Sequence, residues 1–194
     1  MEFLVALGRA AGLSLGAGLN LYATLVALGL AVRFDLVELP AAYDPLGSNV
    51  ALGVFVILYL IEFLADKIPW LDSAWDLVHT IVRPLGGALL AVAAAGPNPA
   101  GVDAAVALLG ASLAGTSHVT KSSTRVAANI SFLPGLGLVL SLVEDVIAVA
   151  MAVMVVFVPL VALAVTVILL FVFVWVIVTV RRTILKRRTA RSSS

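Results

Sequence analysis

The chain has 194 residues, of which 62% are hydrophobic and 12% are charged, and its formal net charge at pH 7 is +1. Its mean hydropathy of +1.17 is far from that of a soluble domain, in which about a quarter of the residues are charged. We therefore expect an integral membrane protein without a large soluble catalytic domain. Cysteine is absent, which excludes disulfides, thiolate metal sites and cysteine nucleophiles.

The first apolar run begins after Glu2 and continues to about residue 32. It differs from a signal peptide, because an acidic residue stands where basic residues are usual and the run passes any plausible cleavage site. We expect a retained first span near residues 10–32. An acidic loop with Asp35, Glu38 and Asp44 follows it.

Five further spans are predicted by hydropathy and by the positions of Pro and Gly. They lie near residues 50–66, 84–96, 103–118, 136–156 and 158–180. The sequence thus predicts an all-α, polytopic membrane helix bundle of about six spans, in a single transmembrane domain over residues 1–180.

Basic residues gather near Arg83, near Lys121 and in a tail over residues 181–194. By the positive-inside rule this distribution favours cytoplasmic positions for both termini. The tail is expected to contact anionic lipid headgroups.

Six spans divide into three plus three, which predicts an inverted repeat formed by residues 1–96 and 101–180. Weak similarity between segments of the two halves places Glu62 opposite Glu144 and Asn20 opposite His118. Runs of small residues such as "GLSLGAG" permit close helix packing, either within one protomer or in a homodimer.

Polar residues recur at helical spacing in three stripes, which puts each set on one helix face. The sets are Gly12, Gly16, Asn20 and Thr24; Asp72, Asp76, His79 and Arg83; and His118, Ser122, Arg125 and Asn129 with Lys121 alongside. The three stripes either line a hydrated path or provide polar partners for one another inside the bundle. For the second stripe, which Asp66 and Lys67 precede, the alternative is an amphipathic helix at the cytoplasmic interface that acts as a gate.

Glu144 and Asp145 lie well inside an apolar segment. Adjacent carboxylates there must be neutral, paired or hydrated, and ionisable groups within spans usually mark a functional pathway. Lys121, Arg125 and Arg83 are the candidate partners. A proton relay, a cation site, a structural ion pair and catalysis remain open as alternatives.

Asp72, Asp76 and His79 would present two carboxylates and an imidazole from one helix, with Glu62 or Glu144 completing the shell of a divalent metal. A solvated or ion-paired face explains the same spacing. No cofactor is predicted beyond this weak metal candidate, and no motif of a hydrolase or a phosphate-binding loop is present.

Four segments together resemble a bacterial integral-membrane family known as domain of unknown function 4126. They are "GLNLYATLVALGL", "YLIEFLADKIPWLDSAWDLVHTIVRPLGGALLA", "AGTSHVTKSSTRVAANIS" and "LSLVEDVI". The resemblance covers roughly residues 12–150, which leaves residues 155–191 largely outside it as an added anchor. It implies a small multi-pass protein of the bacterial inner membrane and supplies no catalytic assignment. It points to Tyr22 and otherwise to the polar residues of the stripes and to the ionisable residues already named above.

The resulting hypothesis is a transporter or channel for a proton, a cation or another small charged solute. The candidate binding residues are Asn20, Glu62, His118, Lys121, Arg125, Asn129, Glu144 and Asp145. Translocation of lipid headgroups and a structural or assembly role without transport remain as alternatives. The expected partners are the lipid bilayer and a second copy of the chain, with no role for nucleic acid.

Overall fold

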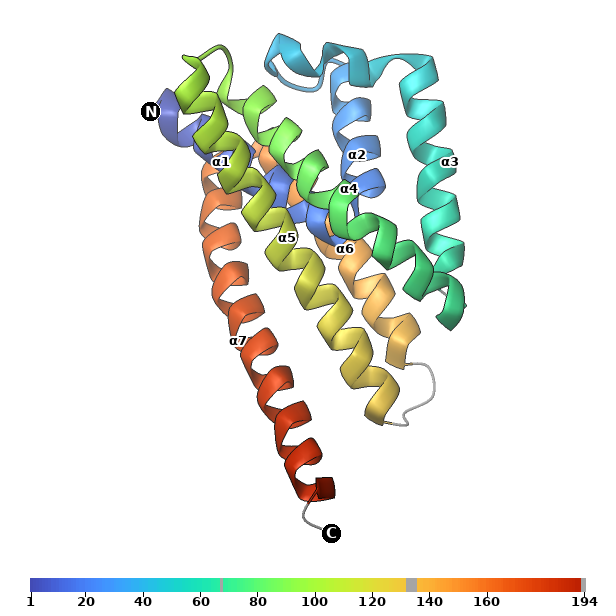
Figure 1. Cartoon of the computed structure of the whole chain (residues 1–194). Helices are drawn as coiled ribbons and strands as arrows, with labels where there is room; N and C mark the ends of the chain where they lie inside the picture. The colour runs from blue at the N-terminus through green and yellow to red at the C-terminus, as the bar shows by residue number, and fades with distance from the viewer. Residues whose placement is uncertain (67, 132–135, 193–194) are drawn as a thin grey trace.

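Long runs of Leu, Val and Ala favour helices in a bilayer, where every backbone polar group must be satisfied within its own segment. The computed structural model describes residues 1–66, 68–131 and 136–192, without the side chains at 69, 70, 72, 73, 126, 129–131 and 184–192. Lys67 and the side chains of Asp72 and Asn129 therefore lie outside the described residues. Within the described part every regular element is a helix (Figure 1). The elements are α1 (Glu2–Leu19), α2 (Leu21–Arg33), η1 (Ala41–Gly47), α3 (Asn49–Ala65), α4 (Pro69–Ala95), α5 (Ala100–Ser131), α6 (Leu136–Phe157) and α7 (Pro159–Ser192).

Five of the helices in the described ranges are long and apolar enough to cross a membrane. A sixth span results if η1 and α3, which meet at 70°, are counted as one bent span. The predicted all-α polytopic bundle is confirmed. The predicted span at 136–156 coincides with α6, whereas α4 and α5 extend well beyond the predicted ranges 84–96 and 103–118.

The first predicted span, residues 10–32, is wrong as a single helix. The helix stops at Asn20, whose backbone is extended (φ −146°, ψ 102°) and whose side-chain oxygen accepts a hydrogen bond from the amide of Ala23 at 2.9 Å. Asn is a favoured N-cap, so the side chain that ends α1 also starts α2.

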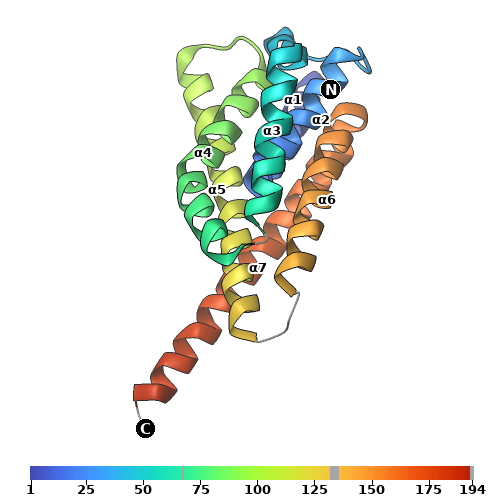
Figure 2. The same cartoon turned by 90° about the vertical axis from the view of Figure 1, so that its right-hand side faces the viewer.

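Helices α1 and α2 form a hairpin, because the chain reverses at this break (Figure 2). The guanidinium of Arg9, on α1, donates to the carbonyl of Glu38, in the loop after α2, at 3.1 Å. The loop therefore returns beside the first half of α1.

The chain ends lie at opposite ends of the bundle in Figure 1. The α1–α2 hairpin enters and leaves at one end, and α3 to α7 then run alternately away from that end and back to it. The bundle therefore does not support the predicted location of both termini on the same side of the membrane. That prediction counts residues 10–32 as one crossing, whereas α1 and α2 divide them.

Helices α1, α4 and α5 pack closely at a set of small residues, Ser14, Gly18, Gly87, Gly110 and Ala114, which we call the glycine seam. A Cβ on Gly110 would lie 2.6 Å from Ala91 Cβ and 2.5 Å from the carbonyl oxygen of Gly87, and one on Gly18 would overlap Ser117 and Ala114. Ser14 Oγ donates to the Gly87 carbonyl at 2.8 Å. Small residues let membrane helices approach in this way, and the seam fixes the position of the helix break relative to α4 and α5.

Candidate functional site

Seven ionisable side chains meet in the bundle interior around the break at Asn20. The acids come from α3 and α6 and from the residue that ends α3, and the bases come from α4 and α5. All seven side chains are buried. The members of this ionic network are Glu62, Asp66, Arg83, Lys121, Arg125, Glu144 and Asp145. Charged groups at such positions are costly unless they are paired, so the pairing shows what stabilises each one.

Arg83 and Glu62 form the most deeply buried pair, with both side chains fully inaccessible and 2.6 Å between Nη2 and Oε1. Arg83 Nη1 also donates to the carbonyl of Gly18 at 3.2 Å. Since Gly18 is in the last turn of α1, the guanidinium lies at the helix end where the macrodipole favours positive charge.

Lys121 is shared among three carboxylates. Its Nζ lies 3.4 Å from Glu62 Oε1, 3.4 Å from Asp66 Oδ2 and 3.7 Å from Glu144 Oε2. It also donates to the carbonyl of Leu19, the last residue of α1, at 3.3 Å. One ammonium thus joins α3, α6 and the helix break.

Asp66, just after α3, accepts from Arg125 Nη2 at 2.7 Å and from Ser141 Oγ at 2.9 Å. Burial by itself would raise the pKa of Asp66. The charges of Lys121 and Arg125, with the hydrogen bonds from Ser141 and Arg125, outweigh that effect and hold the pKa below its ordinary value. Arg125 also reaches Glu144 at 3.5 Å, so Glu144 is paired with two of its three predicted partners.

Asp145 has a different environment from the other three acids. Its Oδ1 accepts from Asn20 Nδ2 at 2.8 Å, and no ion pair joins it to a cation in the described ranges. Its Oδ2 is buried without a hydrogen-bond partner, as is Oε2 of Glu62. Asp145 is therefore the network acid whose charge is least compensated by direct contacts.

The contacts of the two histidines constrain where their ring protons lie. Arg83 Nη1 can only donate, so His118 Nδ1, 2.9 Å away, accepts and Nε2 carries the proton that faces Thr80 Oγ1 at 3.3 Å. The carbonyl of Trp75 can only accept, so His79 Nδ1 donates to it at 2.8 Å. His79 Nε2 lies 3.2 Å from the hydroxyl of Tyr22, which can donate to it or accept from it.

His79 and Arg83 are 1% and 0% exposed, and α4 contributes the candidate span Ala74–Ala95. These two side chains therefore lie in the bundle interior and not on the outward face of an interfacial helix, and their role as a gate stays a prediction. Asp76 is partly exposed and accepts from Ser122 Oγ at 3.1 Å, which joins α4 to α5.

The weak metal candidate finds no support in the geometry. Among the described residues no group of three or more His, Asp and Glu side chains is placed to hold a metal ion. Both ring nitrogens of His79 are engaged by Trp75 and Tyr22, and the side chain of Asp72 is outside the description.

Sequence reasoning missed several polar contacts of the site. Ser141 binds Asp66, Thr80 binds His118, and Ser117 Oγ donates to the carbonyl of Leu15 at 2.9 Å. Ser141 stands three residues before Glu144, on the same helix face, and this spacing was the available signal.

A model of the family described as "Domain of unknown function (DUF4126)" matches residues 7–179. The match includes most of α7, so the expected limit of the resemblance near residue 150 is wrong. No curated protein and no solved structure matches the chain.

Proposed function

Since the chain belongs to the DUF4126 family of membrane proteins, we propose, from the site itself, that it transports protons or a small cation coupled to protons. Asp145 is the proposed ion-binding group. The observation that carries the proposal is a buried carboxylate with one oxygen unpartnered and no cation in contact, at the tip of a broken helix.

The helix break supports this proposal because broken helices in transporters expose their ends near the middle of the membrane, where ions bind. The last carbonyls of α1 are occupied by Arg83 and Lys121. The first turn of α2 lies beside Asp145 through Asn20. The positive end of the α2 dipole stabilises the ionised carboxylate there, whereas burial without a cation in contact favours the protonated form.

A proton fits the surroundings of Asp145 better than a metal cation does. Alkali and alkaline-earth ions need several oxygen ligands, but Asn20 presents its N–H to Asp145 and uses its oxygen to cap α2. A proton needs only the unpartnered Oδ2.

For orientation, we propose that the end of the bundle at which α7 finishes faces the cytoplasm of a bacterial inner membrane. Arg181 and Arg182 are exposed there, and the acidic loop with Asp35, Glu38 and Asp44 lies at the opposite end. Helices α3 and α6 run in opposite directions, as do α4 and α7, which is consistent with the inverted repeat.

The test is proton flux into vesicles that contain the purified protein and a trapped pH-sensitive dye. Asp145→Asn keeps the shape of the side chain, and we expect at least a tenfold loss of flux with the protein still monodisperse. The matched control is Asp44→Asn, in the exposed η1 turn, which should keep full flux. Unchanged flux in Asp145→Asn would rule out this site.

A structural or assembly role is the second candidate, favoured by the short buried contacts Arg83–Glu62 and Arg125–Asp66. It predicts no proton flux in the wild-type protein. Replacement of a network residue would then lower stability without any selective loss of activity.

A further inference from the structure

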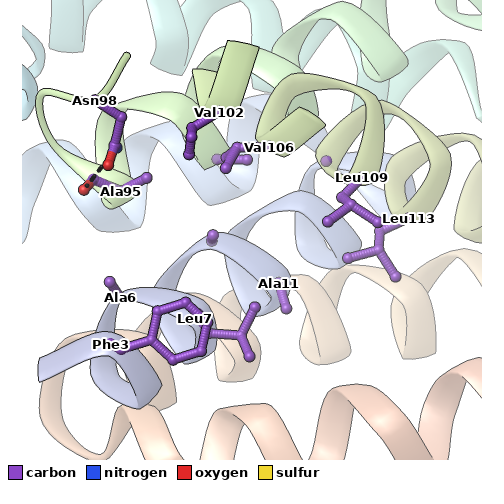
Figure 3. A pocket seen from close by; sticks show the side chains of 13 residues that line it. Phe3, Ala6, Leu7, Ala11, Ala95, Asn98, Val102, Val106, Leu109 and Leu113 are labelled. Atoms are coloured by element: carbon purple, nitrogen blue, oxygen red, sulfur yellow. Dashed lines mark hydrogen bonds between the residues drawn. The ribbon is translucent and has the colours of Figure 1, made fainter. Parts of the chain in front are cut away.

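An apolar cavity of about 260 Å³ lies between α1, α4 and α5 (Figure 3). Its α1 lining, within residues 3–11, comes before the seam residues of α1 and the break at Asn20. Phe3 and Leu7 of α1 line one wall, Ala91 and Ala95 of α4 a second, and Leu109 and Leu113 of α5 the third. This cavity is separate from the proposed proton site.

The cavity exists because the three helices are in contact at the seam and diverge toward the turn between α4 and α5. Its α1 and α4 walls contain the small residues Ala6, Ala10, Ala11, Ala91 and Ala95, which leave the space unfilled. Protein interiors are normally close-packed, and a void of this size forfeits dispersion contacts. An occupant would restore them.

Water is a poor occupant. A buried water needs two to four polar partners, and apolar cavities of about 150 Å³ stay dry and bind small apolar molecules. Asn98 is the single polar side chain among the lining residues. Its amide nitrogen already donates to the carbonyls of Ala95 and Gly96, at 3.3 and 2.8 Å.

We propose that this cavity binds one hydrocarbon chain of a membrane lipid. Rim residues Phe3 and Leu109 are 76% and 61% exposed and belong to candidate spans, so the cavity adjoins the acyl region of the bilayer.

The test uses a phosphatidylcholine with a photoreactive diazirine in its acyl chain, in nanodiscs with the full-length protein, and maps cross-linked residues by mass spectrometry. We expect the highest cross-link density at residues 3–11 and 102–113. An even distribution over these segments and the lipid-facing surfaces of α3 and α7 would overturn the proposal. Cross-links between two protein copies at this face would overturn it as well.

A cavity-filling variant tests the same site independently. Ala6→Leu with Ala95→Leu adds volume at two partly exposed walls, and we expect at least a fivefold loss of cross-links at Leu109 and Leu113. The matched control is Ala164→Leu, at an exposed position of α7, which should leave them unchanged. If the filled variant folds and its cross-linking is undiminished, the proposal is contradicted. If the variant does not fold, the cross-link map of the wild-type protein decides.

Discussion

The glycine seam and the ionic network both hold helices together, but they do so by opposite means. At the seam, α1, α4 and α5 approach until no Cβ fits at Gly18 or Gly110. In the network, long charged side chains reach across, and the described backbone of α3 does not pack against that of α5 or α6. The seam therefore leaves no room between its backbones, whereas Lys121 Nζ lies within 3.7 Å of three carboxylates at once.

The largest effect is expected from Lys121→Met, which removes the charge common to three carboxylates. Breaking a buried ion pair by deleting one partner costs about 3–5 kcal/mol, so the free energy of unfolding in a detergent titration should fall by about that amount. Arg33→Met, at an exposed arginine, is the control and should change it by less than about 1 kcal/mol. Equal effects would mean that the network contributes nothing to stability.

The seam is tested next by Gly18→Ala, whose methyl group would overlap the Ala114 backbone. Overpacking of this kind costs about 1–3 kcal/mol, and the same titration should show a loss near the upper value. Gly53→Ala on α3 is matched to it, because a Cβ there meets nothing within 4 Å. That control should be neutral or stabilising by up to about 1 kcal/mol, and similar results for the two glycines would refute the tight packing of the seam.

A smaller effect is expected from Ser14→Ala, which removes the 2.8 Å hydrogen bond to the Gly87 carbonyl. Interhelical hydrogen bonds in membranes are worth about 0.6 kcal/mol on average. Ser112→Ala is the control, since that exposed hydroxyl bonds only within its own helix, to Leu108. A Ser14 variant as stable as the control would show that close packing alone holds the seam.

The smallest expected effect is on the loss of stability at acidic pH. Because the folded state lowers the pKa of Asp66, its ion pairs stabilise the protein above the ordinary aspartate pKa, near 3.8, and this contribution is lost as pH falls through the lower folded value. Thermal unfolding at pH 5 and pH 3 should show a larger drop in the wild type than in Asp66→Asn. Parallel drops in the two proteins would contradict this assignment.

That the chain is a membrane protein, and most residues of its site, could be predicted from the sequence. Ionisable residues within apolar segments usually belong to a buried polar cluster. Glu62, Lys121, Arg125, Glu144 and Asp145 were all identified from this principle, and the structure brings them together. Helical spacing also correctly placed His79 and Arg83 on one face of α4. Helical spacing carries no information on depth in the membrane, so it cannot distinguish an interfacial helix from a buried one.

The break at Asn20 and the choice of partners were not predictable from local patterns. Asn20 sits in a run of apolar and small residues, with no Pro to mark an end, and its capping role depends on the reversal that follows it. Pairing is set by tertiary geometry: Arg83, a candidate partner of Glu144, binds Glu62 instead. Sequence spacing cannot distinguish such choices between helices.

The hairpin at the start of the chain has a consequence for the order of assembly. Its tip is completed by Lys121 at a separation of 102 residues and by Asp145 at a separation of 125 residues. During synthesis the hairpin therefore exists before α5 and α6 can meet it, and contacts between such distant segments form late. The first part of the protein to be made is thus among the last to reach its final surroundings.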